Sequence, residues 1–176
     1  MIHRLMNPTE RKISSLSVLL VALTFLTVGC RSSRPKPVAW NVSITKVTPA
    51  SIEVDVVGVT PSEKPYWMNS VKPDDYWKQN SSIRNGARKV SNNLQTGQPW
   101  VLGKENPIWK EWFGYGATEL MIMANLPGKG YDNGPFDRRR VFISLDKKVW
   151  EAKDNTIQIQ VQDEFIRVLT PQKPAG

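Results

Sequence analysis

The chain has 176 residues, a length that suits one domain with its own hydrophobic core. Its net charge is +8, an excess that would favour an anionic surface, but the charges are spread along the chain, which is more typical of solubility than of nucleic-acid binding. The only histidine is His3 and the only cysteine is Cys30, so the sequence from residue 31 onward excludes Ser-His-Asp and Cys-His catalysis, internal disulfides and the usual zinc sites.

The first 29 residues have the order of a secretory signal. Three basic residues among the first 12 precede an uncharged run of 16 residues, 13–28, and Gly29 stands before Cys30. A membrane-spanning helix needs about 20 apolar residues, so this run fits a signal core better than a permanent anchor. We therefore expect residues 1–29 to be removed as a signal peptide.

The stretch Leu26-Thr27-Val28-Gly29-Cys30 resembles the lipobox of bacterial lipoproteins, in which a small residue precedes an acylated cysteine. The family has Leu three places before the cysteine, whereas this chain has Thr27 there and Leu26 one place farther back. An ordinary secretory signal that ends beside a cysteine is the alternative interpretation.

The lipobox resemblance implies a covalent lipid on Cys30, and we expect no other cofactor. It implies three acyl chains in a Gram-negative host or two in a Gram-positive one, and two or more chains are enough for stable anchoring, because each buried methylene contributes about 0.8 kcal/mol. Arg31 stands where an Asp would resemble the inner-membrane retention signal. The expected location is therefore the cell envelope, on the periplasmic face of the outer membrane if the host is Gram-negative.

Polar and proline-rich residues follow the cysteine, so we expect residues 30–37 to form a lipidated tether and residues 38–170 to form a single domain. Apolar and polar residues alternate over 40–45 and over 52–56, which predicts two strands. A turn sequence at 48–50 separates them. Together these features predict a hairpin with one face buried.

The middle of the chain, residues 59–117, is irregular, with many prolines, glycines and asparagines and no long periodic run. It predicts one short helix over 73–78, which has a proline in the first position and two acids in the first turn. It predicts a second helix over 107–113, which Gly114 ends.

The last third of the chain predicts several further strands. Residues 120–124 are apolar throughout, which is typical of a central strand, and residues 140–145 and 156–162 alternate. Further strands are expected at 165–169 and near 149–151, and the tail 171–176 is expected to be disordered. The fold predicted from all of these elements is mainly β, a small antiparallel β-sandwich with an irregular tryptophan-rich insert that carries one or two short helices.

Aromatic residues concentrate in the middle segment and are the first candidate site. One interpretation is a platform for sugar rings or for a partner protein, because large rings give contact area at low entropic cost. The other is packing, in which rings pin an irregular segment to the sheet. The candidate residues are Trp67, Trp77, Trp100, Trp109, Trp112 and Tyr115.

Four carboxylates, Asp74, Asp75, Glu105 and Glu111, lie in the same segment. A pair of them would suit acid–base cleavage of a glycosidic bond, which depends on a separation that sequence does not reveal. Asp74 and Asp75 are more simply explained as first-turn acids of a helix.

Two later motifs can each be explained by a structural role. Residues 128–134 are glycine-rich but lack a phosphate-binding spacing and a calcium ligand pattern, so they predict a hairpin connection. Arg138, Arg139 and Arg140 begin a predicted strand. They favour either contact with anionic headgroups or an acidic partner, or a solvated edge that charge protects against strand addition.

The layout of the chain resembles the small outer-membrane lipoprotein of type VI secretion systems. The shared features are domain size, the tether, the strand at 52–56, and a strand, charged loop and strand over 120–161. The insert around 66–116 has no counterpart in that family. The resemblance implies a tethered transthyretin-like β-sandwich without catalytic activity, which docks to the periplasmic part of an inner-membrane protein.

We therefore expect a non-enzymatic structural or docking subunit of a cell-envelope assembly, with secretion as the context that the resemblance implies. Its partners would be the membrane, through the lipid on Cys30, and an envelope protein, and not nucleic acid. The alternative is a module that binds peptidoglycan or another glycan through the tryptophan cluster. A carboxylate-dependent glycan hydrolase comes third.

Overall fold

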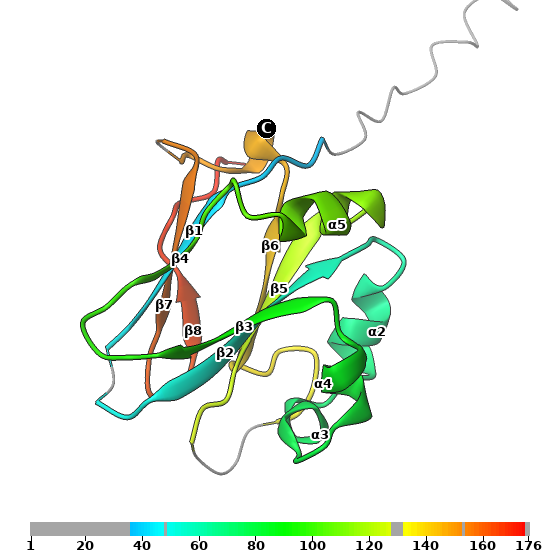
Figure 1. The fold of residues 1–176 in the computed structure, drawn as a ribbon, viewed down its shortest axis with the longest axis vertical. Helices are drawn as coiled ribbons and strands as arrows, with labels where there is room; N and C mark the ends of the chain where they lie inside the picture. Colours follow the sequence, from blue (N-terminus) through cyan, green and yellow to red (C-terminus); the bar gives the residue numbers. More distant parts are fainter. Residues whose placement is uncertain (1–35, 48, 128–131, 153, 175–176) are drawn as a thin grey trace, which may run out of the picture. The chain divides into compact units, whose positions relative to one another are not determined.

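Eight strands form two four-stranded sheets in the computed structural model, which describes residues 36–47, 49–127, 132–152 and 154–174 (Figure 1). The first sheet has the order β4-β1-β7-β8 and the second has the order β3-β2-β5-β6. The strands are β1 (Asn41–Lys46), β2 (Ile52–Val59), β3 (Lys89–Leu94), β4 (Trp100–Leu102), β5 (Glu119–Ala124), β6 (Arg140–Ser144), β7 (Thr156–Val161) and β8 (Ile166–Val168). The predicted signal 1–29, Cys30 and most of the tether lie outside the described residues.

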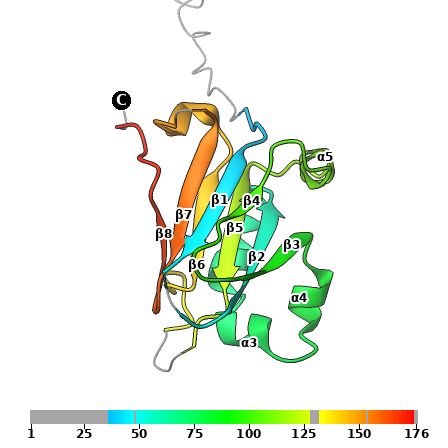
Figure 2. The ribbon, with the colours of Figure 1, turned by 60° about the vertical axis from the view of Figure 1, so that its left-hand side comes forward.

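The two sheets pack as layers of a β-sandwich, so the predicted mainly β fold is confirmed (Figure 2). Neighbouring strands are antiparallel except for β1 and β7, which run parallel with Val42 opposite Ile157 and Ile44 opposite Ile159. The predicted central strand 120–124 corresponds to β5, which lies between β2 and β6. The strands predicted at 140–145, 156–162 and 165–169 correspond to β6, β7 and β8.

The predicted hairpin of the first two strands is wrong. β1 lies between β4 and β7 in the first sheet, whereas β2 lies between β3 and β5 in the second. The alternation over each strand specifies which side chains are buried, and both strands do bury Val42, Ile44, Val54 and Val56 between the sheets. The alternation does not specify which strand is the hydrogen-bonded neighbour. In the structure the connection from β1 to β2 crosses from one sheet to the other and does not form a hairpin.

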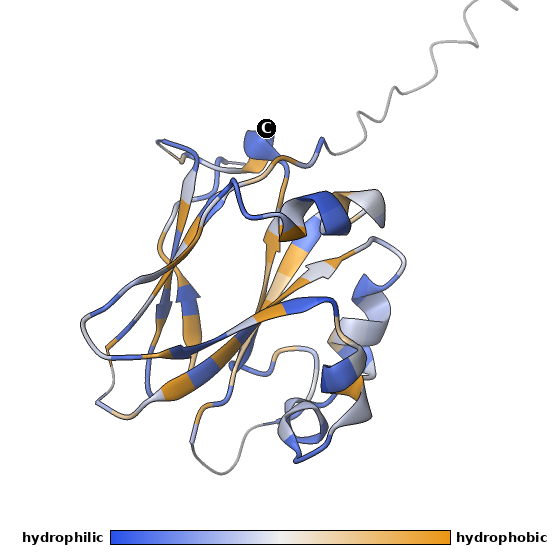
Figure 3. Ribbon diagram, in the orientation of Figure 1, coloured by the Kyte–Doolittle hydropathy of each residue, from blue (hydrophilic) through white to orange (hydrophobic). Residues whose placement is uncertain are grey.

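The second sheet is buried on both faces, because a helical insert covers the face turned away from the first sheet (Figure 1). The insert consists of α2 (Lys64–Asn69), α3 (Pro73–Trp77) and α4 (Ser82–Gly86). Val54 and Val56 of β2 enter the core between the sheets, whereas Val57 and Val59 pack against the insert. Apolar residues accordingly concentrate along the strands, and polar residues along the helices and loops (Figure 3).

The predicted helix at 73–78 is α3, and the predicted helix at 107–113 is α5 (Ile108–Gly114), which lies across one end of the sandwich (Figure 1). α2 and α4 were not predicted, and neither were the edge strands β3 and β4. α4 begins after Ser81, whose hydroxyl accepts a hydrogen bond from the Arg84 N–H at 3.3 Å. Within the described ranges, no helix is both long and apolar enough to cross a bilayer.

The strand predicted near 149–151 is instead a 3₁₀ turn, η2 (Lys147–Val149), followed by a single bridge between Trp150 and Gln172. The Asp146 carboxylate accepts a hydrogen bond from the Lys148 N–H at 2.9 Å, which stabilises the turn against an extended strand. The Lys173 N–H donates to the Val149 carbonyl at 2.8 Å, so the chain is hydrogen-bonded to this turn as far as residue 173.

Candidate functional site

Trp109 and Trp112 project from α5 into the core between the sheets. Their rings meet edge to face, with centroids 5.1 Å apart. The Trp112 indole donates to the Arg88 carbonyl at 2.9 Å, and the Trp109 indole donates to the Gly103 carbonyl at 2.9 Å. Both rings are buried, so their faces pack the core and do not meet solvent.

Trp67 and Trp77 belong to the helical insert on the other face of the second sheet. Trp67 is buried and packs edge to face against Tyr76, with a centroid separation of 6.3 Å. Trp77 is half-buried, and the Arg84 guanidinium lies 4.4 Å from the centre of its ring. These rings hold the insert together and attach it to the sheet.

Trp100 and Tyr115 complete the predicted aromatic set. Trp100 is half-buried on β4 and packs against the core between the sheets. Tyr115 is 56% exposed, and the Arg88 guanidinium lies 3.7 Å from the centre of its ring. The six predicted rings are therefore distributed over both faces of the second sheet and do not form one platform.

Three of the four candidate carboxylates have separate partners. Asp74 bonds Arg139, Asp75 pairs with Lys78 at 2.5 Å, and the Glu105 carboxylate lies 3.8 Å from the Lys104 ammonium. Glu111 lies on α5. Among the described residues, no group of three His, Cys, Asp or Glu side chains is placed to hold a metal ion.

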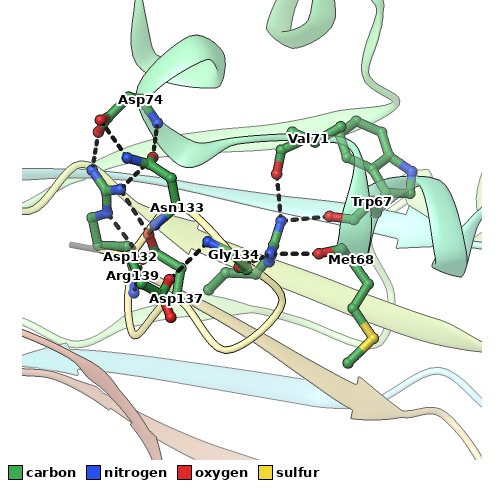
Figure 4. Close-up of polar contacts among 10 residues, drawn as sticks. Trp67, Met68, Val71, Asp74, Asp132, Asn133, Gly134, Asp137 and Arg139 are labelled. Atoms are coloured by element: carbon green, nitrogen blue, oxygen red, sulfur yellow. Dashed lines mark hydrogen bonds and ion pairs between the residues drawn. The ribbon is translucent and has the colours of Figure 1, made fainter.

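Arg139 joins the β5–β6 connection to the start of α3 (Figure 4). Its Nη1 donates to Asp74 Oδ1 at 2.5 Å, and its Nη2 donates to Asp137 Oδ2 at 2.7 Å and to Asn133 Oδ1 at 2.9 Å. The Asn133 side chain also donates to Asp74 Oδ2 at 2.7 Å. We call these four residues, Asp74, Asn133, Asp137 and Arg139, the arginine clamp.

The arginine clamp shifts the pKa values of its members in the directions that favour charge. Hydrogen bonds from Arg139 and Asn133 hold the pKa of Asp74 below its ordinary value. Burial raises the pKa of Asp137, but hydrogen bonds from Arg139 outweigh burial and leave the pKa below its ordinary value. Burial lowers the pKa of Arg139, but the two carboxylates outweigh burial and raise it overall.

Arg140, the next residue, is bound by main-chain carbonyls. Its Nη1 donates to the carbonyls of Trp67 and Val71, and its Nη2 donates to those of Met68 at 2.9 Å and Gly134 at 2.7 Å. Two of these carbonyls belong to the last turn of α2, where a cation is favoured by the unpaired carbonyls and the helix dipole.

The positive charge of Arg140 has no carboxylate counter-ion within the part of the chain that the structure describes. The side chain is only 7% exposed, and its Nε–H is buried without a hydrogen-bond acceptor among the same residues. Burial lowers the pKa of this guanidinium, because the charged form loses hydration. Arg140 therefore carries a buried charge that main-chain carbonyls bind directly, and the carboxylates of Asp137 and Asp132 favour that charge without forming an ion pair with it.

A third polar cluster lies under the insert, around Asp55 of β2. The Asp55 carboxylate is fully buried and accepts from the Tyr76 hydroxyl at 2.8 Å and from Arg84 Nε at 2.7 Å. Arg84 also pairs with Glu53. Burial, and then the negative charge of Asp55, raise the pKa of Tyr76 far above its ordinary value. The contacts of this cluster hold α3 and α4 on the sheet.

A largely apolar hollow of about 580 Å³ opens beside β6. Its lining includes Phe136, Phe142, Phe165, Ile166, Arg138 and Arg140, and we call it the β6 hollow. Phe136 is 82% exposed, and Arg138 is also exposed. The hollow combines exposed aromatic surface with positive charge.

The sequence interpretation of the three consecutive arginines as a solvated or lipid-facing cluster is wrong for two of them. Arg139 and Arg140 are buried and bind groups of the same chain, and only Arg138 is exposed. The roles of Asp55, Tyr76 and Arg84 were also missed. One signal was present for Asp55, because the apolar run Val56 to Val59 that follows it indicates a strand buried on both faces.

Comparison with known proteins finds matches only among solved structures, since no family model and no curated protein matches the chain. A chain in a structure described as "Type VI membrane complex" is 13% identical, with a TM-score of 0.52, covering 76% of this chain and 99% of that one.

A chain in "T6SS protein TssM C-terminal domain (869–1107) from EAEC" is 14% identical, with a TM-score of 0.50 and coverage of 74% and 99%. "Serratia marcescens Lip, a membrane bound component of the Type VI Secretion System" is 12% identical, with a TM-score of 0.44 and coverage of 77% and 99%. At such identities the first two matches establish a shared fold.

Proposed function

We propose that this chain is a non-enzymatic docking subunit of a cell-envelope secretion assembly, held at a membrane by a lipid on Cys30. The observation that carries the proposal is the two-sheet fold, which is similar to a chain of a type VI membrane complex over 99% of that chain. The lipobox-like stretch that ends at Cys30 supports the membrane attachment. Both features support a subunit that is tethered at one end and binds a partner with its folded domain.

The arrangement of the buried polar groups supports a structural role. The arginine clamp, Arg140 and the Asp55 cluster all bind groups of the same chain and attach the helical insert or the β5–β6 connection to the second sheet. Their charges serve to hold surface segments in place. A fixed insert and fixed connections are what a docking subunit needs, because ordering them in advance lowers the entropic cost of binding.

The proposed location is the periplasmic face of the outer membrane, and the proposed partner is the periplasmic domain of an inner-membrane protein of the same assembly. Arg31, directly after the lipidated cysteine, supports the outer membrane, because an Asp in that place would resemble the retention signal of the inner membrane.

The lipid anchor is tested by expressing the full chain in a Gram-negative bacterium and comparing it with the Cys30→Ser variant. We expect the wild type in the outer-membrane fraction, with an N-terminal peptide at Cys30 that carries three acyl chains by mass spectrometry. The Ser variant is expected in the soluble fraction. An unmodified Cys30, or equal membrane attachment of both variants, would contradict the anchor.

The docking role is tested with the detergent-solubilised full chain and the periplasmic domain of the inner-membrane component from the same organism. We expect saturable binding with a Kd of about 1 μM or tighter by calorimetry, as is typical of specific interfaces. Absence of saturable binding would overturn the docking proposal, whatever the result for the lipid.

A further inference from the structure

β6 is an edge strand of the second sheet, and its outer side borders the β6 hollow. The Ala124 N–H donates to the Arg139 carbonyl at 2.9 Å and the Leu145 N–H donates to the Thr118 carbonyl at 2.9 Å, so the odd-numbered residues of this segment face β5. In an antiparallel ladder the intervening residues point their main-chain groups the other way. The N–H and C=O of Phe142 therefore face the open edge.

On either side of Phe142, one outward main-chain group already has a partner. The Arg140 N–H donates to the Asp137 carbonyl at 3.1 Å, and the Ser144 carbonyl accepts from the Trp150 indole at 2.8 Å. Neither main-chain group of Phe142 has an outward hydrogen bond within the described ranges. Phe142 thus offers one donor and one acceptor at this edge, the pair of groups with which an added strand bonds a single residue.

The surroundings of this edge define the chemistry of a ligand. Phe136 and Phe165 line the hollow with aromatic surface, and Phe136 is 82% exposed. Arg138 is exposed, with no ion pair to any described residue, and Arg140 contributes a buried charge that has no counter-ion there. Asp137 also lines the hollow, but both of its carboxylate oxygens accept hydrogen bonds from Arg139.

We propose that the β6 hollow binds an extended segment of a partner envelope protein, which adds to the edge of β6 at Phe142. The segment places a large apolar side chain against Phe136 and Phe165, and an acidic side chain at Arg138. The charges favour one acid rather than a run of acids, because Asp163 and Glu164 lie in the exposed turn just before Phe165. This inference rests on the proposed function, since it specifies how the partner would be held.

The first test is photo-crosslinking in cells with the full chain, in which p-benzoylphenylalanine replaces Phe136. The matched control carries the same residue at Val101, which is 52% exposed on β4, an edge strand of the other sheet. We expect an adduct with an envelope protein at position 136 and none at position 101. The partner's crosslinked peptide is expected to contain an acidic residue within two positions of a large apolar one.

The second test reverses one charge in the chain that carries p-benzoylphenylalanine at position 136. Arg138→Glu is expected to lower the adduct yield at least tenfold, whereas Lys110→Glu, an exposed charge on α5, is expected to leave the yield unchanged. Circular dichroism spectra of the variants should match that of the wild type, because both substituted side chains are exposed.

Several outcomes overturn the hollow as a docking site. Adducts only with lipid would assign it to an acyl chain, and adducts only with a second copy of the chain would assign it to self-association. If the purified periplasmic domain binds the Arg138→Glu and Phe136→Ser variants as tightly as the wild type, docking uses another surface. In that last case the proposed function stands and only the hollow proposal fails.

Discussion

Gly58 of β2 lies directly against the indole of Trp112. A Cβ atom at position 58 would overlap Cγ and Cδ1 of that ring and would stand 2.8 Å from Cδ2. The Trp112 indole is buried and held by its hydrogen bond to the Arg88 carbonyl, so it has little freedom to move aside. The absence of a side chain at Gly58 is thus what lets α5 pack against the second sheet.

Replacement of this glycine is expected to be costly for that reason. Gly58→Ala should lower the free energy of unfolding by about 2–3 kcal/mol, because an added methyl overpacks a filled core. Urea denaturation followed by tryptophan fluorescence measures this. Gly103→Ala is the control, since a Cβ atom added there would meet nothing within 4 Å, and it should shift the value by less than about 0.5 kcal/mol. Equal effects of the two substitutions would contradict the packing argument.

Arg140 is expected to be essential for the helical insert. Arg140→Met should lower the free energy of unfolding by about 3 kcal/mol, because four main-chain carbonyls lose their donor. Hydrogen exchange should show the largest loss of protection in α2. Arg138→Met, at the exposed arginine two positions earlier, serves as the control and should change the free energy of unfolding by less than about 0.5 kcal/mol. Uniform loss of protection over both sheets would instead indicate a global effect.

Asp137 is expected to make the free energy of unfolding depend on pH in the acid range. The folded-state pKa of Asp137 lies below the ordinary value of 3.8. The contribution of Asp137 to the free energy of unfolding is therefore complete above pH 3.8, and it is lost as the pH falls through the lower folded-state pKa. Asp137→Asn should lower the free energy of unfolding by about 2–3 kcal/mol at pH 7, where the buried Arg139 loses its main counter-ion. The difference in the free energy of unfolding between this variant and the wild type should become smaller below about pH 4.

Urea midpoints at pH 7, 5 and 3 measure this narrowing for the two proteins. Asp163→Asn, in the exposed turn before β8, is the matched control and should follow the wild type at each pH. A gap between Asp137→Asn and the wild type that stays constant from pH 7 to pH 3 would mean that the carboxylate charge is not what stabilises the clamp.

The tryptophans are expected to behave as core residues in solution. Five of the seven are buried, namely Trp40, Trp67, Trp109, Trp112 and Trp150, and the other two are half-buried. Fluorescence emission should therefore be blue-shifted, poorly quenched by acrylamide and unchanged by peptidoglycan fragments. Red-shifted emission that responds to those fragments would favour the glycan-binding alternative.

Local patterns in the sequence were sufficient for most elements of this fold. The alternation in β7 and the unbroken apolar run in β5 predict the strands that the structure contains. Pro73 and two acids in the first turn of α3 predict a helix start for local reasons, since both effects act within one turn. The absence of histidine and cysteine after residue 30 likewise excluded whole classes of catalysis without reference to any fold.

The edge strands and the pairing of the strands could not be predicted from such local patterns. β3 has the sequence KVSNNL and lies at the edge of its sheet, where few apolar residues are buried and alternation is weak. β1 and β2 have clear alternation, yet they lie in different sheets, because alternation reports the buried face and not the hydrogen-bonded neighbour.

The sequence by itself determined that the chain past residue 30 is a mainly β domain without histidine or thiol chemistry, because composition and period-two alternation are local properties. Only the tertiary structure decided that the side chains of Arg139 and Arg140 are buried. A guanidinium is buried when carboxylates and carbonyls surround it, and here they come from the distant helices α2 and α3 as well as from the adjacent β5–β6 connection. Three consecutive arginines look identical in the sequence, whereas in the fold one is exposed and two bind groups contributed by segments about 70 residues away.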